Sequence, residues 1–506
     1  MPARGTLRRA LLFSALFLGS VAALGAQETP GEGLPVQDHT LENGLRLLIL
    51  PRTGAPTVSF VVQYPIGSVN ERPGITGIAH LLEHLFFKGT TTIGTRNHEG
   101  EVPLLEEMDL LHDTVLMVRE AESPDSIRIG ALNRRIHTLE RRASELAVSN
   151  EFDAILTENG ARSLNAMTTT ESTTYFVELP SNRAELWFVL ESDRMRNPVF
   201  REFYTERDVV AEERRLRLET NPSGLLYEAL LAEAFKVHPY GRPVVGSMED
   251  IQGLSRRDVQ DYFRRFYGPN NAVVSIVGDV DPGQILRWAR RYLGSIPGGP
   301  PAQQVVIQEP DQTGERRVEI VLDAEPMLQI GWRVPSALQE DAPALAMLAS
   351  LLTGGRSSRL YHRLVLQDRT ATNVVSGTAP GNRYPGLFHI DAIPLSPHTP
   401  IEVEEAIYEE IQRLKDEPPR EMELQRVRNQ LEASNVRRLS SNLGLALQFA
   451  ESTSLYGDWE RTFGFTRIMA AVTPADVQSV VRRYFRKDHR TVAVLRKSAG
   501  GEGGSP

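Results

Sequence analysis

Apolar and polar residues follow two distinct periods along this chain, one typical of strands and the other typical of amphipathic helices. Short runs that are almost continuously apolar or β-branched predict buried strands, and they span residues 45–50, 57–62, 173–179 and 272–277. Asn43-Gly44 is a turn signal ahead of the first run, and we expect the first two runs to pair with each other. Longer stretches with helical spacing predict helices at residues 78–87, 183–194, 205–219 and 284–292.

Residues 99–153 have a different pattern. Apolar residues recur there at spacings of three and four on both sides of Ser123-Pro124-Asp125. This pattern predicts an antiparallel helical hairpin with an apolar seam and charged outer faces. Such a hairpin can pack only against itself, or it can contact a partner or a substrate, and the sequence leaves both interpretations open.

The order of predicted elements repeats after a linker that begins at Gly298-Gly299-Pro300-Pro301 and extends to residue 316. Beyond it, the same patterns predict strands at 318–322, 328–332 and 491–495, and helices at 342–352, 357–366, 401–415 and 420–433. The last strand corresponds to the one that ends at Val277. We therefore predict two α+β domains, at residues 37–297 and 317–497, with the hairpin inserted in the first and a disordered tail at 498–506.

The composition is that of an ordinary globular protein, with 41% hydrophobic and 24% charged residues in 506. The formal net charge of -9 argues against nucleic acid as a partner, because proteins that bind phosphates are usually basic. There are no cysteines. Their absence excludes a cysteine nucleophile, disulfide bonds and a thiolate zinc site, so any metal must be held by His, Asp or Glu.

The N-terminus has the pattern of a signal peptide. Arg4, Arg8 and Arg9 precede an apolar run at 10–18, and Ala26-Gln27 is a suitable cleavage point. The run is shorter than the ~20 residues that a spanning helix needs. We predict a signal peptide at 1–26, a periplasmic or secreted location, and no stable membrane span after cleavage; an uncleaved anchor is the alternative.

His80 and His84 stand four residues apart in the helix predicted at 78–87, with Glu83 beside the second histidine. On a helix this spacing puts both imidazoles on one face, as two nitrogen ligands of one Zn²⁺ require. Glu83 can then take a proton from a water that the metal activates, and that water attacks a peptide carbonyl. The order H-x-x-E-H is the inverzincin arrangement. The alternative is an apolar helix in which these polar residues fall together by chance.

A catalytic zinc site requires a third protein ligand and one open position. The acidic helix predicted at 205–219 offers four carboxylates, namely Glu206, Glu212, Glu213 and Glu219. Spacing alone does not choose among them, and an acidic helix is most often a solvated face.

Several longer motifs resemble those of the pitrilysin or insulinase family of zinc metallopeptidases, peptidase family M16, which includes the β subunit of the mitochondrial processing peptidase. They are the metal helix at 74–90, the N-A-x-T strand at 164–168, the third-ligand helix at 206–213, and landmarks at 266–279 and 355–360. The resemblance extends over nearly all of the mature chain. It implies an α+β fold of two homologous αβ-sandwich domains, of the LuxS/M16-like metalloenzyme type, that form half of a two-part clamshell.

The resemblance implies that His80, His84 and Glu213 bind one zinc ion per chain and that Glu83 is the general base. The register of the arginine in Glu206-Arg207 selects Glu213 rather than Glu212.

The same resemblance implies that Glu206, two helical turns before Glu213, orients one of the ligands. Asn165 and Ala166 would lie on the strand that receives an extended peptide substrate by β-augmentation. A peptide held in this way is recognised mainly through its backbone.

One departure from the family concerns an Arg and a Tyr that grip the substrate in its C-terminal half. Val365 and Thr372 stand at those positions, and neither replaces a guanidinium or a phenol. A chain of this length supplies one half of the clamshell. We therefore predict a dimer, and specifically a heterodimer with a homologous subunit that carries the Arg/Tyr pair; a homodimer that grips the substrate with other residues is the alternative.

Three functions are compatible with these residues: a zinc endopeptidase acting on peptides or unfolded segments in a chamber, a non-catalytic assembly subunit, and a metal-binding peptide receptor. Every motif residue is present, and metal binding alone does not require Glu83, so the first is favoured. The sequence leaves open the natural substrate, the cleavage preference and whether manganese or cobalt can replace zinc.

Overall fold

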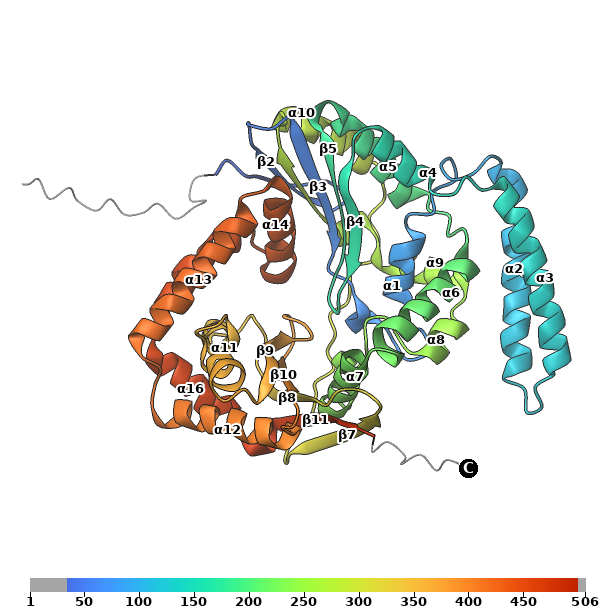
Figure 1. The fold of residues 1–506 in the computed structure, drawn as a ribbon. Helices are drawn as coiled ribbons and strands as arrows, with labels where there is room; N and C mark the ends of the chain where they lie inside the picture. Colours follow the sequence, from blue (N-terminus) through green and yellow to red (C-terminus); the bar gives the residue numbers. More distant parts are fainter. Residues whose placement is uncertain (1–33, 499–506) are drawn as a thin grey trace, which may run out of the picture.

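Two mixed sheets organise the chain in a computed structural model that describes residues 34–498 (Figure 1). The first sheet has the order β1 (Gln37–Thr40), β2 (Arg46–Pro51), β6 (Val273–Gly278), β3 (Thr57–Tyr64), β5 (Thr173–Pro180) and β4 (Arg162–Thr168). The second has the order β7 (Arg316–Leu322), β11 (Arg490–Lys497), β8 (Met327–Val334), β10 (Gly386–Pro394) and β9 (Ala371–Ala379). These two layered units confirm the predicted α+β class.

The two sheets repeat one pairing scheme. Strand β6 runs parallel to β2 and antiparallel to β3, and β11 runs parallel to β7 and antiparallel to β8. In each unit the last strand in sequence therefore lies between two earlier strands: β6 lies between β2 and β3, and β11 lies between β7 and β8. The two hairpins β4–β5 and β9–β10 then extend the sheets in the same manner.

The expected pairing of the first two apolar runs is wrong. They form β2 and β3, but β6 lies between them, because every residue of β6 is buried and such a strand belongs at the centre of a sheet. The Asn43-Gly44 turn instead joins β2 to β1, with Gly44 at a φ of 87°. Strand β1 was not predicted, because its residues Gln37–Thr40 are all polar; it pairs with β2 through the backbone and through the ion pair of Asp38 with Arg46 at 2.7 Å.

Helices cover both sheets. In the first half they are α1 (Ile78–Leu85), α2 (His98–Arg119), α3 (Ser126–Leu146), α4 (Glu151–Glu158), α5 (Ala184–Arg196), α6 (Phe203–Arg214), α7 (Pro222–Ala234), α8 (Met248–Gly253), α9 (Arg256–Phe266) and α10 (Pro282–Trp288). In the second they are α11 (Ala342–Thr353), α12 (Pro400–Asp416), α13 (Glu421–Leu439), α14 (Asn442–Tyr456), α15 (Arg461–Ala471) and α16 (Pro474–Tyr484). The helices predicted at 205–219, 284–292 and 357–366 each end in a π-helical segment, at Arg215–Glu219, Ala289–Leu293 and Tyr361–Gln367.

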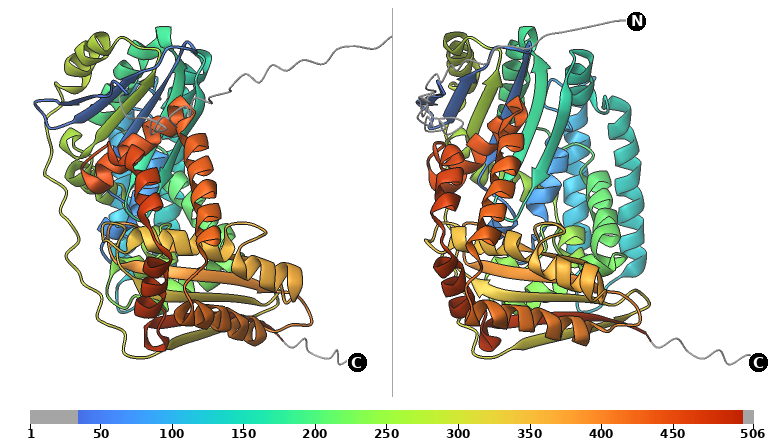
Figure 2. Two further views of the ribbon diagram at one scale, coloured as in Figure 1. Left: turned by 90° about the vertical axis from the view of Figure 1, so that its left-hand side faces the viewer. Right: turned by 60° about the vertical axis from the view of Figure 1, so that its left-hand side comes forward.

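Each half covers the other half's sheet with one helix. Helix α14 of the second half packs Leu445 and Phe449 on Leu48, Val61 and Val277 of the first sheet. Helix α7 of the first half packs in the same way on β11 of the second sheet. Figures 1 and 2 show α14 against the upper sheet and α7 beside the lower one. The two halves are therefore joined by two apolar interfaces as well as by the linker.

A polar contact also joins the halves, at the turn between β4 and β5. The carboxylate of Glu171 accepts hydrogen bonds from the backbone N–H groups of Asn382 (2.9 Å) and Arg383 (2.7 Å), in the turn between β9 and β10, and from the hydroxyl of Tyr240. The β4–β5 turn is thus held against the second half.

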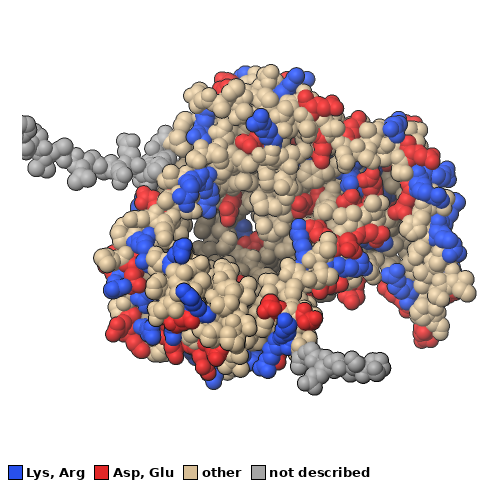
Figure 3. All heavy atoms as spheres, viewed as in Figure 1, with Lys and Arg blue, Asp and Glu red and all other residues tan. Residues whose placement is uncertain are grey.

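Helices α2 and α3 form an antiparallel hairpin that projects from the first half (Figure 1). Its seam is apolar and includes the fully buried Leu139, and side chains of both charges cover its exposed face (Figure 3). The base of the hairpin packs on the first half, where the buried carboxylate of Asp109 pairs with Arg256 at 2.7 Å.

The predicted signal peptide at 1–26 and all but the first residue of the predicted tail at 498–506 lie outside the described residues. None of the helices within residues 34–498 combines the length and the apolarity needed to cross a membrane.

Candidate metal centre

The loop before α1 is fixed by two buried or partly buried carboxylates. Glu71 accepts hydrogen bonds from the backbone N–H groups of Gly77 (2.8 Å) and Ala79 (2.9 Å), and Asp250 binds the backbone and hydroxyl of Thr76. Burial raises the pKa of Glu71 to about 8 even though both backbone hydrogen bonds lower it. Gly77 has a φ of 88°, and a Cβ there would lie 2.4 Å from the carbonyl oxygen of Val245. These contacts set the start of α1 and the direction of its histidine-bearing face.

Helix α1 brings His80 and His84 together as the sequence predicts, with ring centroids 4.9 Å apart. The Nε2 atoms of these residues lie 3.5 Å and 3.6 Å from Oε2 of Glu213, which comes from the adjacent helix α6. Two ligand atoms of a tetrahedral zinc site, each ~2.1 Å from the ion, are separated by roughly 3.4 Å. Both distances to Oε2 of Glu213 match this spacing, and one potential ligand atom from each of the three residues lies within 4.8 Å of the others.

Two polar atoms of this cluster lack hydrogen-bond partners among the described residues. Oε2 of Glu213 is buried and forms no hydrogen bond, and Nδ1 of His80 is also buried and unpaired. Buried polar atoms are rarely left unpaired in proteins. Burial, with the nearby His84 and Arg217, lowers the pKa of His80 to about 3, so its ring is neutral and keeps a lone pair for a metal. The donor set of two imidazoles and a carboxylate fits zinc.

The four acidic candidates on α6 and its π-helical extension differ in where they point. Glu213 faces the histidines through Oε2, while its Oε1 pairs with Arg217. The side chain of Glu212 is 58% exposed and pairs with Arg215, and Glu219 lies 3.6 Å from Arg214. Of these three, only Glu213 belongs to the cluster of potential ligands.

The fourth, Glu206, lies behind His84. Its Oε2 is 3.1 Å from Nδ1 of His84, and its Oε1 is 2.6 Å from Nζ of Lys88. Burial would raise the pKa of Glu206, but the hydrogen bonds from His84 and Lys88 outweigh it and hold this pKa below its usual value. The contact directs Nε2 of His84 towards Glu213.

Glu83 lies beside the cluster and points to the first sheet. Its Oε2 accepts a hydrogen bond from the hydroxyl of Thr168, the last residue of β4, at 2.5 Å. Burial, and to a smaller extent the charge of Glu213, raises the pKa of Glu83, whereas the Thr168 hydrogen bond lowers it. A partly buried carboxylate with a raised pKa, next to a potential metal site, suits a general base. Thr168 belongs to the N-A-x-T motif recognised in the sequence, but the sequence did not predict its contact with Glu83.

Asn165 and Ala166 lie on β4, the outermost strand, and among the described residues this strand pairs only with β5. The side-chain oxygen of Asn165 accepts a hydrogen bond from the backbone N–H of Ala166 at 2.8 Å. Met167 is 41% exposed. The edge is thus open to solvent, and it ends at the residue that contacts Glu83.

Val365 and Thr372 lie in the second half, in the π-helical segment and at the start of β9. The hydroxyl of Thr372 donates to the backbone carbonyl of Ile393 in the neighbouring strand. Neither residue belongs to the histidine cluster.

A two-domain αβ fold that carries a helix-borne histidine pair, a carboxylate from a neighbouring helix and an adjacent open strand edge defines a class of peptidases. The chain belongs to peptidase family M16. The model of the insulinase domain of this family matches residues 47–105 and 139–247, and the model described as the peptidase M16 inactive domain matches residues 253–431. The residues between the first two matched segments, 106–138, lie in the α2–α3 hairpin.

Comparisons with individual proteins agree with this family. The chain is 26% identical over 505 residues to the zinc protease PqqE of Helicobacter pylori, which covers 97% of this chain and 99% of that one. It resembles the crystal structure of a protease from Helicobacter pylori with a TM-score of 0.75 and 25% identity, over 91% of this chain and 99% of that one. It also matches 47% of the periplasmic protease PqqL of Escherichia coli, with a TM-score of 0.64 and 17% identity over 91% of this chain, which shows the fold alone.

Proposed function

We propose that this chain is a zinc-dependent endopeptidase that hydrolyses peptides or unfolded segments inside a chamber. His80, His84 and Glu213 hold one zinc ion, and Glu83 is the general base. The observation that carries this proposal is Oε2 of Glu213, a buried oxygen without a hydrogen bond that lies within 3.6 Å of Nε2 of both histidines.

The chemistry divides between the ion and the chain. When bound, zinc supplies a Lewis acid that lowers the pKa of a water to ~7 and polarises a peptide carbonyl. Glu83 takes the proton from the attacking water and returns it to the leaving amine. Its raised pKa supports this double task, because a base that must give its proton back is most effective with a pKa close to the working pH.

The substrate lies along β4 as an added strand. The open edge at Asn165 and Ala166 offers backbone groups to an extended peptide, and the end of this edge at Thr168 is in contact with Glu83. The chamber requires a second half, which we assign to a homologous subunit that carries the Arg/Tyr pair missing at Val365 and Thr372. We place the mature protein in an exported compartment.

The main alternative is a non-catalytic subunit that binds peptides without cleaving them. The experiment that separates the two uses the purified mature chain, alone and with a homologous partner, in a zinc measurement and a quenched-peptide assay. Glu83→Gln keeps its zinc and loses turnover by about 10²–10⁴-fold, whereas the exposed control Glu212→Gln changes neither. Full zinc occupancy without cleavage in any pairing, or normal cleavage by Glu83→Gln, refutes the proposal.

A further inference from the structure

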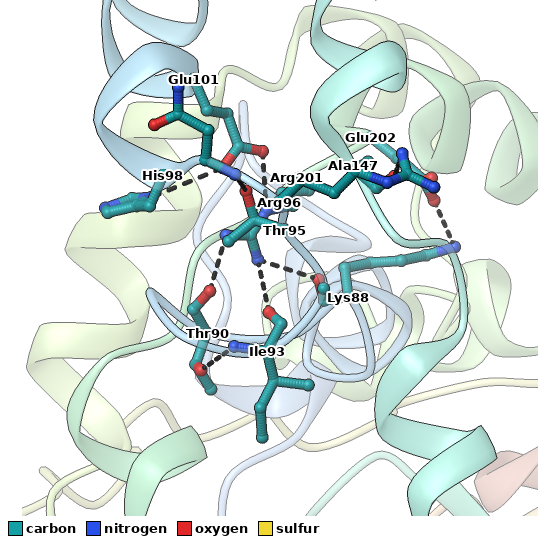
Figure 4. Close-up of polar contacts among 12 residues, drawn as sticks. Lys88, Thr90, Ile93, Thr95, Arg96, His98, Glu101, Ala147, Arg201 and Glu202 are labelled. Atoms are coloured by element: carbon teal, nitrogen blue, oxygen red, sulfur yellow. Dashed lines mark hydrogen bonds and ion pairs between the residues drawn. The ribbon is translucent and has the colours of Figure 1, made fainter.

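A buried ion pair connects the base of the α2–α3 hairpin to the rest of the first half. The base is the end at which α2 begins and α3 ends, opposite the turn between the two helices. The guanidinium of Arg201 donates from Nε to Oε1 of Glu101, in the first turns of α2, at 2.6 Å (Figure 4). Arg201 is 2% and Glu101 is 1% exposed. A buried charge that loses its partner is strongly destabilising, so this pair fixes the hairpin base relative to the residues before α6.

The same guanidinium organises the loop that follows the metal helix α1. Its remaining nitrogens donate to the backbone carbonyls of Lys88 (3.3 Å), Thr90 (2.6 Å) and Ile93 (3.1 Å). The loop is tightly folded around these bonds, because a Cβ at Gly89, which has a φ of 92°, would lie 2.2 Å from the carbonyl oxygen of Ile93. Figure 4 shows the Arg201 side chain between Glu101 and this loop. Arg201 thereby sets the position of the backbone at Lys88.

Lys88 links this loop to His84 through the carboxylate of Glu206. Its Nζ lies 2.8 Å from Glu202, the residue after Arg201, and 2.6 Å from Glu206. The Lys88 side chain is only 16% exposed, so the two contacts are partly shielded from solvent. Glu206 in turn is held against Nδ1 of His84.

We propose that Lys88 and Arg201 are positioning residues that connect the hairpin base to His84 and so tune the affinity for zinc. Lys88 holds Glu206 where it accepts the hydrogen bond from His84, and Arg201 together with Glu101 holds the loop that carries Lys88. The inserted hairpin therefore supports the metal centre through its base, while its distal part is not needed for this task. The proposal rests on the zinc site of the proposed function.

The first experiment removes the cation at residue 88. The zinc dissociation constants of wild type, Lys88→Met and Lys88→Arg are measured by chelator competition, and Lys236→Met is the matched control. Lys236 pairs with Glu233 on the surface, outside the metal centre. Lys88→Met weakens zinc binding by about 10–100-fold, as loss of a group behind a metal ligand does, and Lys88→Arg restores most of it. Lys236→Met leaves the constant unchanged.

A melting experiment separates positioning from general stability. The metal-free Lys88→Met protein melts within a few degrees of wild type, while the rise in its melting temperature on adding zinc is smaller, because that rise follows the zinc affinity. A dissociation constant for Lys88→Met equal to that of wild type refutes the proposal. So does a lowered affinity that Lys88→Arg fails to restore.

A second pair of variants tests the hairpin. Replacing residues 114–128 with a short glycine-serine turn removes the distal part but keeps Glu101 and Asp109, and it leaves the zinc constant unchanged. Arg201→Lys keeps the charge beside Glu101 but cannot reach all three carbonyls, and it weakens zinc binding. If the shortened hairpin alone lowers the affinity, the support comes from the distal part and the proposal is wrong. A wild-type chain that binds no zinc refutes the proposed function itself, whereas a zinc-binding wild type with an unaffected Lys88→Met refutes only the positioning role.

Discussion

The hydrogen bond from Thr168 to Glu83 gives a prediction whose size follows from the structure. Thr168→Val removes the hydroxyl but keeps the shape of the side chain, so Glu83 loses the donor that lowers its pKa while the burial that raises it stays. A hydrogen bond to a charged group is worth about 1.5–3 kcal/mol. The ionised form of Glu83 loses about this much stabilisation in the variant, so the pKa of Glu83 rises and the ionised fraction at acidic pH falls by roughly 10–100-fold.

The assay is the pH dependence of kcat/KM with a quenched peptide. Because the base acts in its ionised form, the acidic limb of the profile moves to higher pH and kcat/KM at a fixed acidic pH falls, while the rate at alkaline pH changes less. Thr174→Val is the matched control, because the hydroxyl of Thr174 is buried and accepts a hydrogen bond from Gln63 but does not contact Glu83. An acidic limb that stays in place in Thr168→Val shows that Glu83 is not the titrating base or that Thr168 does not stabilise its charge.

Three further predictions concern the metal ligand, the loop before α1 and the contact between the halves. Glu213→Ala lowers zinc affinity at least tenfold more than Glu212→Ala in chelator competition, and the reverse order contradicts the ligand assignment. Glu71 keeps its proton up to about pH 8 when folded but loses it near pH 4.5 when unfolded, so the contribution of this group to stability falls by about 1.4 kcal/mol per pH unit between these values; in urea titrations of the metal-free protein, the stability of Glu71→Gln relative to wild type therefore rises with pH by that amount. Phe449→Ala empties a fully buried position and lowers the free energy of unfolding by about 3–5 kcal/mol without changing zinc affinity, and a loss below 1 kcal/mol argues against this interface.

Local patterns predict the parts of the fold that depend on neighbouring residues. The spacing of His80, Glu83 and His84 is a property of one helix, so the side-chain cluster on α1 follows from the sequence once that helix is recognised. Strands β6 and β11 are equally clear, because each contains a buried and mostly apolar run, at 273–277 and 491–495. The pairing of these strands is decided by the rest of the sheet, and no local pattern contains it.

The contacts around the histidines depend on longer separations. Thr168 reaches Glu83 across 85 positions of the chain, and the Arg201–Glu101 pair spans 100. Arg217, which takes one oxygen of Glu213, lies only four residues away, but it stands among several arginines of similar appearance. Spacing therefore predicts which residues are chemically suitable, whereas the partners that orient them emerge only when the elements pack together.

The reciprocal covering of the sheets by α7 and α14 has a consequence for the order in which the protein folds. While the chain is still being made, the outer face of the first sheet, with Leu48, Val61 and Val277, lacks its covering helix α14 until residues 442–456 have emerged. The first half on its own is therefore prone to aggregation. Stopping synthesis at the linker leaves a fragment with an exposed apolar surface. Conversely, a protease that cuts the linker after folding does not release two separate pieces, because each piece still carries a helix that the other one needs.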